Sequence, residues 1–418
     1  MPLYHTRLAE TRVLRMAELF PVVCLLGARQ VGKSTLLAHL LGSKAKAFVF
    51  DPLDDLFNAR RDPELFLSDN PPPLILDEVQ YAPELLPAIK RRVDRQPEAR
   101  GLYFLTGSQN LAVLKDVAES MAGRAGILEL PAMTLAEWIG RVPAPSGRCW
   151  LERWFSGEEG FSASPPARVA ADAPLSHRMW TGLMPKTTEA RGDSDIADIH
   201  RSHVMTYLER DVRRAGNIEH LDEFRRFLAV MAALTGQELN LSQLGRDVGI
   251  SRLTAQKWLA VLGATYQWIQ LPAYHGNTIK RLARHDKGYF HDTGLACFLQ
   301  RLSSSDAVQV SPLRGALFET YAATGILKLA TQLDTPPSAY HWRSAGGAEV
   351  DLLLERDGRL WPFEFKAGTH ITGHDARGIA AFRATYPDQS SAPGAVIAPV
   401  SAPYRLAPGT WVLPYDLQ

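Results

Sequence analysis

Residues 22–41 read VVCLLGARQVGKSTLLAHLL, and this stretch decides the fold of the N-terminal part of the chain. An apolar run that suits a buried strand leads into a glycine-rich turn and then into a helical segment. The turn, from Gly27 to Ser34, matches G-x-x-x-x-G-K-[ST] at every fixed position and lies in the strand-to-helix context that this pattern requires. The N–H groups of such a turn face phosphate oxygens, and the helix N-terminus adds positive potential there. The sequence therefore predicts a nucleotide site of the P-loop kind.

We expect ATP and Mg²⁺ to be the cofactors of this site. Lys33 is expected to reach the β- and γ-phosphates, and Ser34 is expected to ligate Mg²⁺. The residues expected to contact the nucleotide form one continuous run: Gly27, Ala28, Arg29, Gln30, Val31, Gly32, Lys33, Ser34 and Thr35.

Three further strand-like runs, at 48–51, 73–77 and 102–106, alternate with helical segments. This alternation predicts a parallel α/β sheet over residues 1–141. The run at 73–77 ends in Asp77 and Glu78. We expect Asp77 to hold Mg²⁺ and Glu78 to act as the general base toward the attacking water.

The run at 102–106 ends in polar residues that would lie beside Asp77 and face the γ-phosphate. We expect Ser108 to take a catalytic position there, with Thr106 and Gln109 as alternatives, although a capped turn between strand and helix would use the same residues. Arg124 is a candidate arginine finger, acting within its own chain or on a neighbouring subunit. A surface ion pair is an equally open interpretation of Arg124.

The order of these motifs resembles one family over nearly the whole chain. The P-loop, the 77–80 block, the strand end at 106–108 and the segment 122–124 resemble prokaryotic AAA-type ATPases that carry a domain of unknown function, DUF4143. Residues 182–185 are similar to that family's Gly-Gly-Phe-Pro-like element, with Leu183 in place of the second glycine. Residues 207–211 resemble its Tyr-x-x-Arg-Asp motif. The resemblance implies ATP hydrolysis and an assembly of several copies, with a hexameric ring as the form it suggests.

Residues 241–262 read as helix, glycine turn and helix, with Gly249 in the turn, and 266–290 would supply a β wing. We therefore expect a winged helix that contacts DNA, through its backbone or shape rather than a defined base sequence. A protein-contact or lid role is the alternative. The residues expected to contact nucleic acid are basic: Arg252, Lys257, Lys280, Arg281, Arg284 and Lys287.

The C-terminal part resembles the core of the PD-(D/E)xK nucleases. Asp351 lies on one strand-like run, and Glu364 and Lys366 lie on the next, where the two-residue period places both on one face. With Glu319 they form a tentative second Mg²⁺ site, in which Lys366 would steady the nucleophilic water. Cleavage and a binding platform that keeps the fold both remain open.

Composition limits the other classes. The chain has 418 residues with 46 basic and 45 acidic side chains, so its net charge of +1 gives no support to nucleic-acid binding. No apolar run approaches the ~20 residues of a membrane span, and no secretory signal is recognisable, so we expect a cytoplasmic protein without a membrane partner. The 3 cysteines and 12 histidines show no disulfide or zinc spacing. We expect His291 and Asp292 to make loop hydrogen bonds.

We thus expect an α/β multidomain protein with four segments: an AAA-type core at 1–141, a loop-rich insertion at 142–195, a helical and winged-helix domain at 196–302, and a nuclease-like domain at 303–418. The leading hypothesis is a Mg²⁺-dependent ATPase that binds or remodels DNA. The alternatives are an ATP-regulated DNA nuclease and an ATP-binding switch or scaffold that acts on a protein partner.

Overall fold

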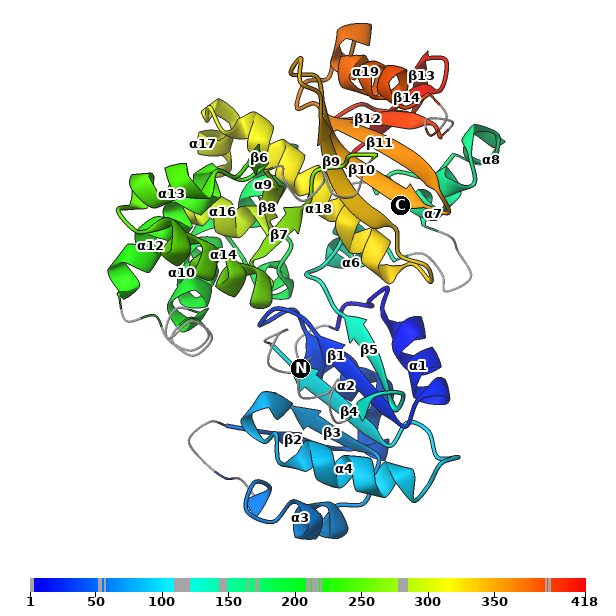
Figure 1. Cartoon of the computed structure of the whole chain (residues 1–418), viewed down its shortest axis with the longest axis vertical. Helices are drawn as coiled ribbons and strands as arrows, with labels where there is room; N and C mark the ends of the chain where they lie inside the picture. The colour runs from blue at the N-terminus through cyan, green and yellow to red at the C-terminus, as the bar shows by residue number, and fades with distance from the viewer. Residues whose placement is uncertain are drawn as a thin grey trace. The chain divides into compact units, whose positions relative to one another are not determined.

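The structure is a computed structural model that describes residues 4–51, 55, 58–108, 121–142, 149–163, 165–169, 173–207, 212, 218, 220–276, 285–387, 389 and 392–418. The chain divides into two compact units (Figure 1). The first comprises residues 1–133 with 264–266, and the second comprises 134–263 with 267–418.

The first unit is a parallel α/β sheet, as predicted. Its five strands lie in the order β2-β3-β4-β1-β5, and every pairing is parallel. Its main elements are α1 (Glu10–Leu19), β1 (Val22–Leu26), α2 (Lys33–Leu41), β2 (Lys46–Val49), α3 (Pro63–Asp69), β3 (Leu74–Asp77), α4 (Leu85–Asp94), β4 (Tyr103–Gly107) and β5 (Ala125–Glu129).

The strand order decides which residues meet at the carboxyl edge of this sheet. β1, β3 and β4 are buried along their whole lengths, which fits a sheet covered on both faces. β4 lies between β1, which leads into the P-loop, and β3, which ends at Asp77. The P-loop, Asp77 and the end of β4 are therefore neighbours.

The second unit contains twelve named α-helices among its described residues. They are α6 (Leu135–Ile139), α7 (Trp150–Phe155), α8 (Glu158–Ala163), α9 (Leu175–Thr181), α10 (Asp193–Thr206), α12 (Leu221–Ala233), α13 (Leu241–Val248), α14 (Arg252–Ala264), α16 (Thr293–Leu299), α17 (Ser305–Val310), α18 (Arg314–Gln332) and α19 (Arg377–Thr385). None of the helices in the described part of the chain is long and apolar enough to cross a bilayer.

Two sheets accompany these helices. The small antiparallel sheet has the order β6-β8-β7, and the large mixed sheet has the order β13-β14-β12-β11-β10-β9. In Figure 1, α18 lies between the helical group around α12–α14 and the large sheet. The strands are β6 (Gln237–Glu238), β7 (Trp268–Leu271), β8 (Lys287–Phe290), β9 (Ser338–Arg343), β10 (Glu349–Arg356), β11 (Arg359–Phe365), β12 (Gly394–Ala398), β13 (Tyr404–Ala407) and β14 (Thr410–Pro414).

The predicted helix-turn-helix is present as α13 and α14. Gly249 ends α13 in the left-handed region, at φ 85°, where glycine has no steric penalty. Gly245 allows the turn to approach α13, because a Cβ added there would lie 2.8 Å from the carbonyl oxygen of Ile250. Ser251 accepts a hydrogen bond from the Thr254 amide and so caps the start of α14.

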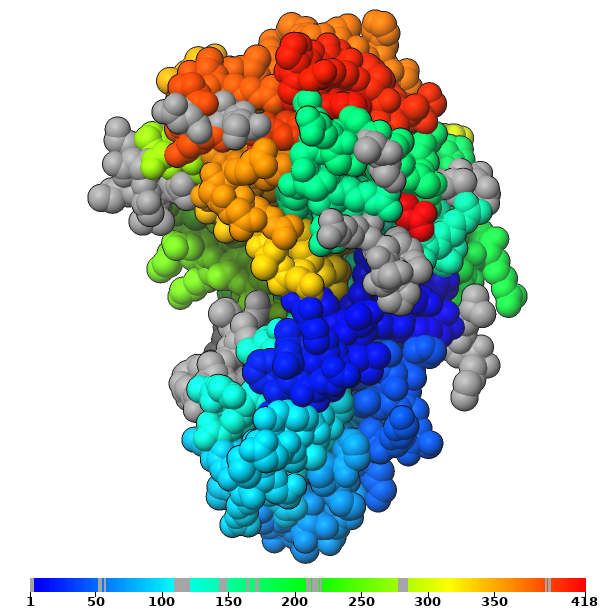
Figure 2. All heavy atoms as spheres, turned by 90° about the vertical axis from the view of Figure 1, so that its right-hand side faces the viewer, coloured from blue at the N-terminus to red at the C-terminus, as the bar shows by residue number. Residues whose placement is uncertain are grey.

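The predicted insertion at 142–195 contains helices that pack into the second unit. Trp150 and Trp154 are buried, as the i, i+4 spacing favours, and their rings contact Phe363 and Trp361 of β11. Figure 2 shows the green atoms of this segment bordering the red C-terminal strands, where Arg405 pairs with Glu158 at 2.8 Å. Within the segment expected as a loop-rich insertion, α7 and α8 thus form helices, and the tryptophan side chains of α7 pack against β11 of the large sheet.

Candidate functional site

The P-loop connects β1 to α2, and the backbone conformation of this turn requires glycine at two positions. Gly27 has φ 155°, and a Cβ added there would lie 2.2 Å from the carbonyl oxygen of Leu130. Gly32 has φ 94°, in the region that side chains rarely adopt. The turn can therefore keep this backbone only with glycine at these positions.

Lys33 begins α2, and its side chain folds back onto the P-loop. Its Nζ donates hydrogen bonds to the carbonyl oxygens of Gly27, at 2.9 Å, and Ala28, at 2.8 Å. The residue is 5% exposed. The ammonium group is thus held at the turn where the β- and γ-phosphates of a nucleotide would bind.

The two carboxylate oxygens of Asp77 each accept a hydrogen bond from a hydroxyl group. Ser34 Oγ donates to Asp77 Oδ2 at 2.7 Å, and the Thr106 hydroxyl donates to Asp77 Oδ1. Hydroxyl and carboxylate oxygens are the ligands that Mg²⁺ prefers. Ser34 and Asp77 therefore fit the predicted metal site of a Mg–ATP complex, where the ion would neutralise phosphate charge.

Glu78 follows Asp77 in a left-handed conformation, at φ 56°, and its carboxylate is held by two polar side chains. Ser108 Oγ donates to Glu78 Oε2 at 3.0 Å, and the Gln80 amide donates to the same oxygen. Ser108 thus lies beside the predicted general base, as expected, whereas Thr106 contacts Asp77. Gln109, the other alternative, lies outside the described residues.

Gln80 and Arg7 are part of this site although sequence reasoning did not select them. Gln80 lies in the short helical turn after Glu78, within the block that carries the family resemblance. Arg7 is 4% exposed and donates from Nη1 to the carbonyl oxygen of Val31, at 2.7 Å, and from Nη2 to that of Pro131, at 2.8 Å. Arg7 thereby connects the P-loop to the segment that follows β5. Its sequence context contains no signal of that role.

Arg124 lies at the opposite edge of the sheet from the P-loop. Its carbonyl oxygen accepts from the Val22 amide at the start of β1, and the P-loop follows the end of β1, about 16 Å away for five residues of strand. Its guanidinium group pairs with Asp94, and this hydrogen bond raises the pKa of Arg124. A finger acting on the site of its own chain is therefore wrong, and a role toward a neighbouring subunit stays a prediction.

The residues predicted to contact nucleic acid differ in their exposure to solvent. Arg252 and Lys257 are exposed on α14. Lys280, Arg281 and Arg284 lie outside the described residues. Lys287 is wrong as a phosphate contact, because it opens strand β8, is 5% exposed and forms ion pairs with Glu319 and Asp351.

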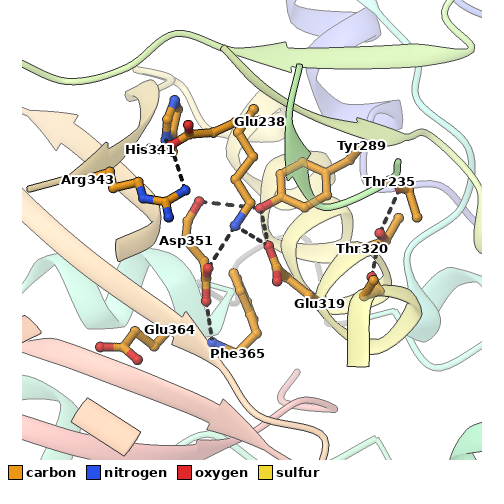
Figure 3. Close-up of polar contacts among 12 residues, drawn as sticks. Thr235, Glu238, Tyr289, Glu319, Thr320, His341, Arg343, Asp351, Glu364 and Phe365 are labelled. Carbon is orange, nitrogen blue, oxygen red and sulfur yellow. Dashed lines mark hydrogen bonds and ion pairs between the residues drawn. The ribbon is translucent and has the colours of Figure 1, made fainter. Parts of the chain in front are cut away.

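The predicted nuclease-like residues lie on β10, on or just after β11, and on α18. Asp351 is 5% exposed on β10, and Glu364 is 4% exposed on the neighbouring β11. Lys366 Nζ lies 3.3 Å from Glu364 Oε2. Glu319 extends from α18 toward Asp351 (Figure 3).

Burial governs the charge of this group. Burial raises the pKa of Glu319 to about 7, and the charge of Asp351 acts in the same direction against the Lys287 ammonium. Burial likewise raises the pKa of Glu364 to about 7, although Lys366 opposes the rise. Among the described side chains, no three His, Cys, Asp or Glu residues are grouped as metal ligands. The predicted second Mg²⁺ site therefore does not fit the residues in this structure.

The Gly182–Leu183 element packs against Asp292. Gly182 has φ 71°, and a Cβ added there would lie 2.2 Å from Asp292 Oδ1. Asp292 Oδ2 accepts from the Leu183 amide at 2.7 Å, and Oδ1 caps α16 through the Leu295 amide at 3.0 Å. The prediction that His291 and Asp292 lie in a hydrogen-bonded loop is confirmed for Asp292. Leu183, in place of glycine, keeps the backbone amide that donates to Asp292.

Comparisons with known proteins match three parts of the chain. Residues 19–139 match an AAA domain, residues 173–306 match a domain of unknown function, DUF8612, and residues 314–417 match the domain of unknown function DUF4143. Two uncharacterized proteins, one of Mycobacterium tuberculosis and one of Mycobacterium bovis, are each 30% identical over 365 residues. The alignment covers 87% of this chain and 74% of each relative.

Solved structures with similar parts include a Walker-type ATPase and a branch migration motor. The Walker-type ATPase of Pyrococcus abyssi is 16% identical, with a TM-score of 0.45, and the match covers 71% of this chain and 96% of that one. The RuvB Holliday junction branch migration motor of Thermotoga maritima is 17% identical, with a TM-score of 0.32, and the match covers 64% of this chain and 90% of that one. Because both TM-scores are below 0.5, the assignment of the nucleotide site rests on the AAA-domain match and on the geometry of the site.

Proposed function

Because this chain belongs to the family of P-loop ATPases that carry an AAA domain followed by a DUF4143 domain, we propose that it couples Mg²⁺-dependent ATP hydrolysis to the binding of DNA. The P-loop supplies the phosphate site, and Ser34 and Asp77 would hold the ion. Glu78 is placed to take a proton from the attacking water, and Ser108 orients its carboxylate. Lys33 stabilises the charge that develops on the phosphates.

The DNA part of the proposal rests on the surface of α14. The order α12, β6, α13, α14, β7, β8, with the small sheet ordered β6-β8-β7, supports a winged helix in which α14 would enter a groove. Arg252 and Lys257 lie exposed on this helix, and the segment between β7 and β8 carries Lys280, Arg281 and Arg284. Such cations bind phosphates by releasing counterions, without reading a base sequence.

The test is ATP turnover measured without DNA and with single-stranded, duplex or branched DNA, using Lys33→Ala as the blank. We expect one DNA form to stimulate turnover. Replacing Arg252 and Lys257 with alanine should weaken that DNA's binding and reduce the slope of log K against log salt by about 2. The matched control is Arg225→Ala with Arg226→Ala, two exposed arginines on α12. Turnover indifferent to every DNA form would instead favour a switch that acts on a protein partner.

We also propose a homo-oligomer, with a hexameric ring as the form to test, in which Arg124 completes a neighbour's site. Arg124 is partly exposed and lies on the sheet edge away from its own P-loop, which suits an action between subunits. Mixing inactive Lys33→Ala with inactive Arg124→Ala should restore turnover, because some interfaces would then combine an intact site with an intact finger. A monomer in gel filtration with ATP, together with no restoration, would contradict the ring.

A further inference from the structure

Lys287 lies inside the nuclease-like centre, although it comes from the small sheet. Its Nζ lies 2.5 Å from Glu319 Oε1 and 2.7 Å from Asp351 Oδ1. Figure 3 shows these two carboxylates reaching toward a common point from α18 and β10. An ammonium group therefore stands between the acids that the sequence predicts as ligands of a divalent ion.

The remaining oxygens of the centre also have donors. Asp351 Oδ2 accepts from the Phe365 amide at 3.1 Å. Glu364 Oε1 accepts from the Ile379 amide of α19 at 3.0 Å, and its Oε2 faces Lys366 at 3.3 Å. In Figure 3, the Glu364 carboxylate points away from that of Asp351. Nitrogen donors thus engage both oxygens of each strand carboxylate, and the two do not converge on one ion.

The register of β8 fixes Lys287 in this position. Lys287 pairs with Glu238 of β6 on one side and with Leu271 of β7 on the other, so β8 is the central strand of its sheet. Tyr289, two residues later and therefore on the same face, donates to Glu319 Oε1 at 2.8 Å. Both side chains enter the carboxylate centre from a strand that is held on both edges.

Electrostatics favours retaining the lysine. The carboxylates of Glu319 and Asp351, at 2.5 Å and 2.7 Å from the buried ammonium group, compensate its charge. A divalent ion would have to displace a buried ammonium group or add its charge beside it. Both are unfavourable where water screens little.

We propose that Lys287 is the resident cation of the nuclease-like centre and occupies the position of a divalent metal, so that this centre does not carry out metal-dependent cleavage. The proposal rests on the contacts among β8, β10 and α18 and is independent of DNA binding by α14. It also gives β8 a function, because Lys287 ties the base of the β7–β8 hairpin to the large sheet.

The first experiment maps metal positions on the full wild-type chain. Fe²⁺ with ascorbate and peroxide cuts the backbone beside bound iron, and mass spectrometry locates the cuts. In the presence of ADP we expect cuts near the P-loop, an internal positive control, and none between 349 and 366. Cuts between 349 and 366 that disappear in Asp351→Asn would overturn the proposal. This result requires no variant of Lys287 to fold.

The second experiment removes the ammonium group. Lys287→Met should be less stable than wild type, and 5 mM MnCl₂ should raise its Tm by about 2–5 °C by binding the released carboxylates. Wild type, Lys287→Arg and the exposed control Lys186→Met should show no such rise. A folded Lys287→Met variant without a Mn²⁺-dependent rise would show that the lysine does not stand in a metal position.

Discussion

Thr106→Val removes one buried hydroxyl from the ATP site and almost no volume. Thr106 is fully buried on β4, donates to Asp77 Oδ1 and accepts from the Glu78 amide at 3.1 Å. Valine would leave that amide and one carboxylate oxygen without this partner, at a cost of about 1–3 kcal/mol. If the loss falls on the transition state, kcat drops roughly 5- to 150-fold. ATP affinity should change little, because the P-loop provides most phosphate contacts.

The assay compares steady-state ATP turnover with binding of a fluorescent ATP analogue for wild type, Thr106→Val and Thr106→Ser. Serine keeps the hydroxyl and should retain most of kcat, whereas a merely structural role for the methyl group would make serine the worse replacement. Thermal unfolding verifies that both variants fold. A Thr106→Val enzyme within twofold of wild-type kcat would refute the idea that this hydroxyl positions Asp77 and Glu78.

Three further predictions concern other residues. Gly27→Ala should lower ATP affinity roughly tenfold or more, because the new Cβ would meet the Leu130 carbonyl oxygen at 2.2 Å; titration with labelled ATP measures this, and unchanged binding would contradict it. Arg7→Met should reduce the free energy of unfolding of the first unit by about 2–4 kcal/mol in urea, whereas exposed Arg15→Met should not. Burial, aided by Lys328, lowers the pKa of His291 to about 3, so the unfolded chain takes up its proton first as pH falls below 6.5. Between pH 7 and pH 5 this group should cost about 2 kcal/mol of stability, and His291→Leu should flatten that slope.

The ATP site could be predicted from sequence because its parts are local motifs at the ends of parallel strands. Gly27 to Ser34 forms a single turn, and Asp77 and Ser108 end strands that the topology makes neighbours. The acidic residues of the C-terminal sheet could be predicted for a similar reason, since two short strands with a two-residue period carry them. In both cases the chemistry follows from short runs and the periodicity of the elements.

Arg7 and Lys287 could not be predicted, because their partners lie far away in the sequence. Arg7 meets Pro131 across 124 residues, and Lys287 meets Asp351 across 64. In sequence, Lys287 ends a basic run and therefore reads as a solvated cation. Only its position at the start of a buried strand, on the same face as Tyr289, turns it inward. The apolar pattern of residues 287–290, KGYF, indicates a buried strand, but it does not identify the carboxylates that pair with Lys287.

The hydrophobic core of the second unit determines which fragments of the chain can fold alone and which segments can be exchanged between relatives. One cluster of buried side chains runs from Trp150 to Leu417, and Arg168 clasps Asp416 at 2.7 Å. The segment 314–417, recognised as a domain by its sequence, would lose Trp150 and Trp154 from beneath β11 if expressed alone. We expect such a fragment to aggregate, whereas 134–418 should remain monodisperse. Recombination between relatives should accordingly exchange this whole region rather than its sequence-defined halves.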